Sequence, residues 1–182
     1  DVYADKLKSI RIHGKGKDKY NNIRLGINGR LDTIQAAVLI PKLEILSKEI
    51  KLRDRVSDLY NISLNSTFTR QQVPFGNNSA WAQYSILCDN TEQRELIISK
   101  LKENNIPSAI YYTKPLHLQE TFRYLNYSVG DFPISENYYK YCLSIPMFPK
   151  IKNLEIEYVI NCVNQVSSNS TFPVHKSFFL TF

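Results

Sequence analysis

The sequence predicts an α+β fold, in which a long kinked helix leads into a small sheet covered by helices. Apolar residues recur at three- and four-residue steps from Leu31 to about Leu64, which is the spacing of one long helix. Pro41 lies inside that stretch, removes one amide donor and crowds the carbonyl of Ala37, so we expect a kink there. After this helix, short segments in which apolar and polar residues alternate are separated by helical segments. This order favours a small sheet with helices packed on it.

The other elements are predicted in order along the chain. Residues 1–12 have the pattern of a short amphipathic helix, and a polar loop with four of the six glycines follows. After the long helix, residues 66–79 are a turn-rich connector. Asp131 and Asn153 are expected to cap the last two helices. Strands are expected at Ala80–Cys88, Ile106–Tyr112 and Leu143–Met147, and helices at about 90–103, 119–126, 133–141 and 153–166.

Composition places the chain among ordinary globular proteins. It has 182 residues, of which 43% are apolar and 22% charged, so it is neither a disordered tail nor a fibre. It has no apolar run that could cross a bilayer and no signal peptide at its first residues, so no membrane partner is expected. Cys88, Cys142 and Cys162 show no close pairing and no metal-ligand spacing. We therefore expect no metal site and reduced thiols of a cytoplasmic protein.

Positive charge is concentrated at the start of the chain. The net charge is +6, and residues 1–30 hold eight Lys or Arg against three Asp, which gives +5. Such a patch attracts phosphates, whether of a nucleic acid, a phosphorylated cofactor or a nucleotide-linked substrate. The run Gly14-Lys15-Gly16-Lys17 lacks P-loop spacing. Aromatic interleaving is limited to Tyr20, and no nucleic-acid-binding motif occurs, so a nucleic-acid partner is not expected.

The stretch GINGRLDTIQ (26–35) joins this basic loop to the long helix. Asn28 and Arg30 lie just before the helix, Asp32 is placed to cap it, and Gln35 is placed to reach back as in a capping box. An amide and a guanidinium at a helix entry suit an anion. A capped helix start with a solvated Arg explains the same residues, and local chemistry alone favours that alternative.

Three stretches together resemble the C-terminal part of the DegT/DnrJ/EryC1/StrS family, which are pyridoxal-phosphate sugar aminotransferases of fold type I. The stretches match the family in their order and spacing as well as in their residues, and the similarity runs from residue 1 to about 166. The stretches are IRIHGKGKDKYNNIRLGINGRLDTIQAAVL, IPSAIYYTKPLHLQETFRYL and GDFPISENYYKYCLSIPMFP.

The resemblance implies specific roles. Asn28 would reach the phosphate of pyridoxal 5'-phosphate in the partner subunit of a homodimer. Arg30 would lie near the substrate, a nucleotide-linked keto-sugar, where it meets a carboxylate or phosphate. His117 and Tyr112 would border the sugar pocket, although a His satisfied within its own loop explains His117 as well.

The resemblance also implies a division of the chain and the absence of a catalytic residue. Residues 1–30 would end the large cofactor domain, 31–65 would be the connecting helix, 66–166 would form the small C-terminal α/β domain, and 167–182 would be an atypical tail. The Schiff-base lysine of the family lies upstream of the segment that matches residue 1, so we assign no catalytic residue.

Several features of the sequence suggest a truncated or split gene product, or trimming of a longer chain. The sequence begins with Asp, its only methionine is Met147, Pro41 interrupts the long helix, and the tail resembles nothing in the family. We therefore expect the C-terminal part of an amino-sugar aminotransferase that is inactive alone and needs a homodimer or a complementary N-terminal half. The alternative is a non-catalytic remnant or dimerisation module.

Overall fold

A computed structural model describes residues 1–18 and 20–167. Residues 168–182, which contain nearly all of the predicted atypical tail, lie outside the described residues. The chain divides into two compact units, one from Asp1 to Ser47 and one from Lys48 onward, and we describe each by itself.

The described residues form an α+β arrangement of five α-helices, two short 3-10 helices and three short strands. In chain order they are α1 (Val2–Arg11), α2 (Thr33–Ser63), β1 (Thr69–Arg70), β2 (Tyr84–Leu87), α3 (Thr91–Glu103), η1 (Leu116–Leu118), η2 (Glu120–Leu125), α4 (Pro133–Tyr141), β3 (Cys142–Ile145) and α5 (Asn153–Ser167).

In the first unit, backbone hydrogen bonds attach the glycine-rich loop to the end of α1. The carbonyls of Ile10 and Arg11 accept from the amides of Ile27 at 2.9 Å and Gly29 at 2.8 Å. These bonds satisfy carbonyls that a helix end leaves without an internal partner. Gly14 has φ +74°, and a Cβ there would lie 1.7 Å from a backbone oxygen, so this close approach requires glycine.

Helix α2 runs without interruption from Thr33 to Ser63 and contains Pro41. Asp32 caps it as predicted, because its Oδ1 accepts from the amide of Ile34 at 2.8 Å. The return contact expected from Gln35 stays a prediction, and so does the kink at Pro41. The part of α2 from Lys48 onward belongs to the second unit.

The sheet of the second unit is antiparallel with strand order β1-β2-β3. Its register pairs Tyr84 with Ile145 and Ile86 with Leu143, so these four apolar side chains share one face. All four are buried. These four side chains belong to the same buried core as residues of α2, α3 and α5.

The strands are shorter than the sequence predicted. The segment Ala80–Cys88 is extended in the sheet only from Tyr84, because Trp81 adopts a left-handed backbone with φ +44° that interrupts pairing. The prediction for Ile106–Tyr112 was wrong, since this segment makes a single bridge from Ala109 to the neighbouring strand. Pro107 lacks the amide that a longer ladder would need. Strand β1 lies within residues 66–79, which the sequence predicts as a connector.

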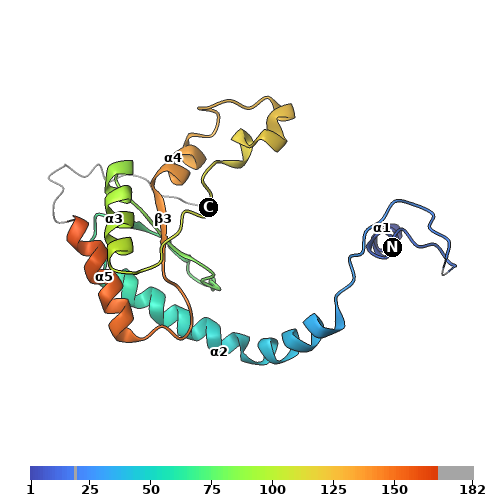
Figure 1. The fold of residues 1–182 in the computed structure, drawn as a ribbon, viewed down its shortest axis with the longest axis horizontal. Coiled ribbons are helices and arrows are strands. Elements are labelled where there is room, and N and C mark those ends of the chain that lie inside the picture. Colours follow the sequence, from blue (N-terminus) through green and yellow to red (C-terminus); the bar gives the residue numbers. More distant parts are fainter. Residues whose placement is uncertain (19, 168–182) are drawn as a thin grey trace. The chain divides into compact units, whose positions relative to one another are not determined.

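The apolar core of the described residues lies entirely between Val56 and Val163. It joins the sheet to α2, α3 and α5, and the last two helices run side by side beside the strands (Figure 1). Tyr60 of α2 packs on Tyr84 of β2 with ring centroids 4.9 Å apart, and its hydroxyl donates to the carbonyl of Pro146 at 2.8 Å.

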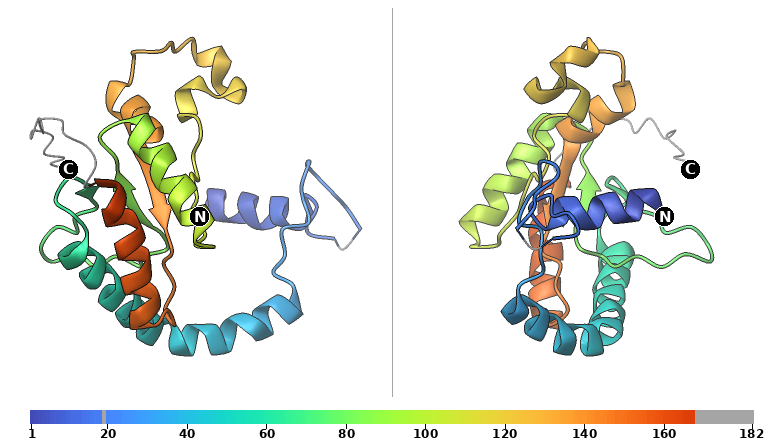
Figure 2. Two further views of the ribbon diagram at one scale, coloured as in Figure 1. Left: turned by 60° about the vertical axis from the view of Figure 1, so that its left-hand side comes forward. Right: turned by 90° about the vertical axis from the view of Figure 1, so that its right-hand side faces the viewer.

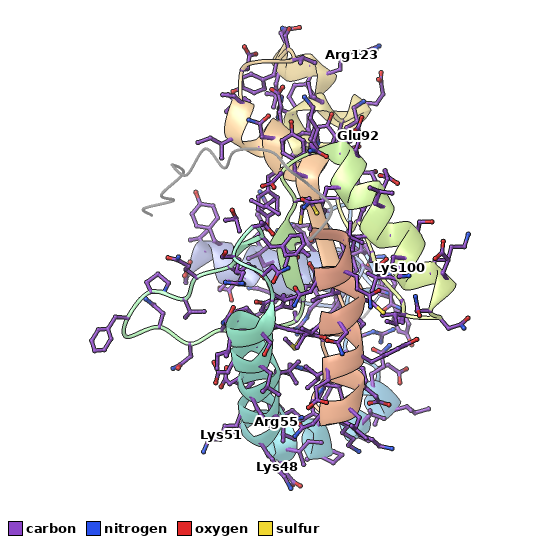
Figure 3. All side chains as sticks on the ribbon, turned by 90° about the vertical axis from the view of Figure 1, so that its left-hand side faces the viewer. Lys48, Lys51, Arg55, Glu92, Lys100 and Arg123 are labelled. Atoms are coloured by element: carbon purple, nitrogen blue, oxygen red, sulfur yellow. The ribbon has the colours of Figure 1, made fainter. Side chains whose placement is uncertain are left out.

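Polar links fasten α2 to α5, which lie next to each other in both views of Figure 2. Arg55, labelled in Figure 3, donates to the carbonyl of Ile151 at 2.8 Å and to the side chain of Asn153. Asn153 thus serves this tertiary contact rather than the cap that the sequence predicted. The carboxylate of Glu155 instead accepts from the amide of Lys152 at 2.8 Å, which closes the helix start.

The three cysteines are free, and two of them are buried. Burial raises the pKa of the Cys88 thiol to about 12, and it also raises the pKa values of Cys142 and Cys162. Thiols of this kind are poor nucleophiles at neutral pH and act as small core residues.

We expect Leu101→Ala to lower the free energy of unfolding by about 2 to 5 kcal/mol, because Leu101 of α3 is 0% exposed and its truncation opens a cavity. Leu96→Ala on the same helix is the matched control. Leu96 is 60% exposed, so its truncation should change that free energy by less than about 0.5 kcal/mol. Urea unfolding followed by circular dichroism measures both. Equal losses in the two variants would contradict the assigned core.

Candidate functional site

The turn from Gly26 to Arg30 is the first candidate site. Asn28 pairs with Ile12 through an isolated antiparallel bridge, which fixes its backbone beside the end of α1. Its side-chain Oδ1 accepts from Nε of Arg30 at 3.1 Å. The structure therefore brings these two predicted residues together on one exposed turn.

The chemistry of this pair fits an anion. The side-chain oxygen of Asn28 accepts from Arg30, and its NH2 group carries two donors that can bind a ligand. Arg30 uses Nε, which leaves the two terminal nitrogens of its guanidinium for a forked contact. Within the residues that the structure describes, Arg30 makes no ion pair with an acidic side chain. The turn can thus present several donors to a phosphate or a carboxylate.

The other two predicted residues lie in the second unit, around the loop that leads into η1. Tyr112 is 73% exposed, with its ring available at the surface. His117 is different, because its side chain is only 8% exposed and its Nε2 lies 3.1 Å from Oε1 of Glu136. Its ring also contacts Phe132, with centroids 4.8 Å apart. The structure thus gives His117 a local partner, and its contact with a sugar stays a prediction.

Glu136 of α4 was not singled out from the sequence, yet several contacts converge on it. Its carboxylate accepts from the amide of Gly130 at 2.8 and 3.0 Å, and from the amide of Phe132 at 3.3 Å. These backbone bonds, chiefly that from Gly130, lower the pKa of Glu136, and His117 adds to the effect. The signal available in the sequence was an acidic residue in the first turn of the helix that begins at Pro133.

Asp131 does not cap α4 as predicted. The helix begins at Pro133 with Phe132 as its N-cap, and no side chain bonds to that cap. The carboxylate of Asp131 accepts instead from the amide of Ser128 at 2.8 Å, within the preceding loop. Glu136 satisfies the Phe132 amide from inside the helix, so Asp131 is left to close a turn of its own.

None of the four predicted residues lines the cavity of about 850 Å³ in the second unit. It is lined by polar side chains of α2, including Asp54, Asp58 and Asn61, and by the segment 66–81. Across residues 1–18 and 20–167, no group of His, Cys, Asp or Glu side chains is arranged to hold a metal. No helix in the same residues has the length and apolar character that crossing a membrane requires.

Comparison with known proteins decides the family. The sequence profile of the DegT/DnrJ/EryC1/StrS aminotransferases matches residues 1–164. The chain belongs to this aminotransferase family. A solved DegT/DnrJ/EryC1/StrS aminotransferase from Brucella abortus is 43% identical, with a TM-score of 0.79, over 90% of this chain and 43% of its own.

Two curated relatives of this aminotransferase family show the same partial coverage. The UDP-2-acetamido-2-deoxy-3-oxo-D-glucuronate aminotransferase of Pseudomonas aeruginosa is 34% identical over 87% of this chain and 43% of its own length. The pleiotropic regulatory protein of Geobacillus stearothermophilus is 36% identical over 88% and 43%. The chain thus spans less than half the length of the relatives it matches.

The lowered pKa of Glu136 predicts a pH-dependent contribution to stability. A carboxylate whose pKa is lower in the folded state stabilises the fold above its unfolded pKa of about 4.3, and this contribution is lost as the pH falls through the folded pKa. We expect Glu136→Gln to destabilise the chain most at neutral pH and the difference to shrink below about pH 4. Urea unfolding across this pH range measures it.

The matched control for the pH experiment is Glu120→Gln, which removes an exposed carboxylate paired only with Arg123. Its effect should be small at every pH. A Glu136→Gln difference that stays constant from neutral to acidic pH would contradict the assigned ionised state.

Proposed function

We propose that this chain is the C-terminal part of an aminotransferase that acts on nucleotide-linked keto-sugars in amino-sugar or polysaccharide biosynthesis. The observation that carries the proposal is the family match over residues 1–164. It is supported by the similarity to the Pseudomonas aeruginosa enzyme, whose name specifies a UDP-linked 3-oxo sugar. The whole enzyme would transfer an amino group onto the keto carbon of such a sugar.

We infer that the cofactor is pyridoxal 5'-phosphate. Aminotransferases of this family depend on it, and solved proteins of this fold include a pyridoxal-phosphate form. When bound, the cofactor supplies the electron sink that amino transfer requires. Asn28 would donate its amide hydrogens to the cofactor phosphate, and Arg30 would bind an anionic group of the substrate. The donor groups that the Asn28–Arg30 turn presents support both assignments.

The exposed apolar surface of the first unit supports an assembly. Among its described residues only Gly14 is buried, and most of its large apolar side chains are exposed, including Ile34, Val38, Leu43 and Leu46 of α2. Several exposed apolar side chains on one helix are typical of a contact surface. We propose that a second copy or a complementary N-terminal half covers it. In the complete enzyme residues 1–30 would end the large domain. Residues 31–65 would form the connecting helix, kinked at Pro41, and residues 66–166 would form the small domain of a fold type I transferase.

The second candidate is a non-catalytic dimerisation module. The exposed apolar face of α2 favours it, because that face suits assembly whether or not a cofactor binds. The similarity to the Geobacillus stearothermophilus protein, which is named for regulation, is compatible with it. The two candidates differ in whether the turn 26–30 and the loop 112–118 meet ligands.

We propose that the Schiff-base lysine is supplied from outside these 182 residues. Incubation with pyridoxal phosphate and borohydride should then give only scattered, substoichiometric labelling of surface lysines, because the lysine that reacts with the cofactor would lie outside this chain. Peptide mass spectrometry measures the labelling. A stoichiometric adduct on one lysine of this chain would overturn this division of roles and would also exclude the dimerisation module.

The roles of Asn28 and Arg30 are tested in a chimera that joins this chain to the remaining segment of the Brucella abortus relative. Asn28→Ala should weaken pyridoxal-phosphate binding about tenfold, because a charge-assisted hydrogen bond is lost. Arg30→Ala should raise the KM for the nucleotide sugar by a similar factor. Absorbance titration and steady-state kinetics measure these effects.

The matched controls are Asn22→Ala and Arg24→Ala, which change the same residue types in the same exposed loop. Neither should alter cofactor or substrate binding. If the control variants reproduce the losses, the turn 26–30 has no specific role in binding.

A further inference from the structure

The segment from Thr113 to Phe132 has almost no apolar core of its own. Among its apolar residues only Pro115 is buried. Its large side chains are mostly exposed, and they include Leu116, Tyr124, Leu125, Tyr127 and Val129. In Figure 1 this segment stands off the end of the sheet, next to α4. Hydrophobic burial therefore does little to fix its conformation, and directed polar contacts must do so.

Those contacts meet at the carboxylate of Glu136. His117 reaches it from the loop before η1, while the amides of Gly130 and Phe132 reach it from the loop before α4. A carboxylate offers about four acceptor sites, and these three groups occupy most of them. The Glu136 side chain is 6% exposed, so water competes little for the rest. One side chain thus ties two loops to one helix.

The backbone around Glu136 is shaped for this arrangement. Gly130 has φ +100°, a conformation that other residues rarely adopt, and its amide contacts both carboxylate oxygens. The ring of Phe132 lies between those of His117 and Tyr127, with centroids 4.8 and 5.0 Å away. The ring contacts and the carboxylate contacts therefore hold His117 in a single place.

We propose that Glu136 is a positioning residue, whose carboxylate locks the loop that carries Tyr112 and His117 onto the start of α4. A nucleotide sugar would then meet this loop already in its binding conformation, which removes the entropic cost of ordering it. The lock itself follows from the contacts of Glu136. Its effect on sugar binding rests on the proposed function, which assigns the loop to the sugar.

Hydrogen–deuterium exchange of the 182-residue chain tests the lock. In Glu136→Gln the amides of 115–119 and of 130–132 should exchange roughly tenfold faster than in the wild type, because the charge-assisted bonds that close both loops are weakened. Exchange in α5, which belongs to the apolar core, should not change. Glu120→Gln is the control, since Glu120 is exposed and pairs only with the outlying Arg123 (Figure 3). It should leave exchange in all three regions as in the wild type.

A second variant keeps the test decisive if Glu136→Gln does not fold. His117→Ala removes the link from one loop and leaves the bonds from Gly130 and Phe132 to Glu136 in place. It should speed exchange at 115–119 and leave 130–132 unchanged. In the double variant, Glu136→Gln should add no further increase at 115–119. Wild-type exchange at 115–119 in His117→Ala, or a further increase there in the double variant, would overturn the proposal.

Titration with UDP-N-acetylglucosamine separates the lock from the proposed function. If the loop meets the sugar, Glu136→Gln should raise the dissociation constant about tenfold, while Glu120→Gln should not change it. Faster loop exchange with unchanged sugar affinity would overturn the positioning role. If the wild-type chain binds no nucleotide sugar, the sugar role of this loop fails, and the exchange data still decide whether Glu136 locks it.

Discussion

The structure depends on one constraint, which is the small extent of its apolar core. The core residues lie between Val56 and Val163, and none of the candidate site residues is one of them. The segments that carry the candidate residues cannot be shaped by burial, so hydrogen bonds with fixed directions shape them instead. The glycine-rich loop is held by amides that bond to the last carbonyls of α1, and the loop before η1 is held through Glu136. Core packing provides the stability, and polar contacts determine where the candidate side chains lie.

Because polar contacts rather than burial shape them, the turn 26–30 and the loop that carries Tyr112 and His117 present different groups to a ligand. Asn28 and Arg30 contact each other and have donors left for an anion, as a phosphate or carboxylate site requires. Tyr112 is open to ligands, whereas His117 is engaged by Glu136. A buried carboxylate that accepts two backbone amides and a ring nitrogen is a strong restraint, since removing it leaves donors unsatisfied. The chain belongs to the DegT/DnrJ/EryC1/StrS aminotransferase family, and it spans less than half the length of the relatives it matches.

The sequence predicted well what depends on local periodicity and capping. Helices α2, α3 and α5 follow from apolar spacing, and the cap at Asp32 follows from residue type. The strands were harder to place, because Trp81 takes a left-handed backbone that its residue type does not suggest. Strand β1 has only two residues and exists through its pairing with β2, so it carries no period of its own.

The site shows the same difference between local and distant information. The resemblance indicated Asn28, Arg30, Tyr112 and His117, whose roles stay predictions. The contact between the first two joins residues two apart in sequence. The partner of His117 is Glu136, which is 19 residues away in α4. The sequence predicts Asp131 as the cap of that helix. Neither spacing nor composition indicates the link from His117 to Glu136, because it depends on how two loops meet on α4.

The most direct measurement is a crystal structure of this chain joined to the remaining segment of the Brucella abortus relative, with pyridoxal phosphate and a UDP-linked sugar bound. The account predicts the Asn28 amide within hydrogen-bond distance of the cofactor phosphate, about 2.7–3.2 Å, and the loop of Tyr112 and His117 beside the sugar. It would be contradicted if both ligands were bound with the turn 26–30 and that loop far from either of them.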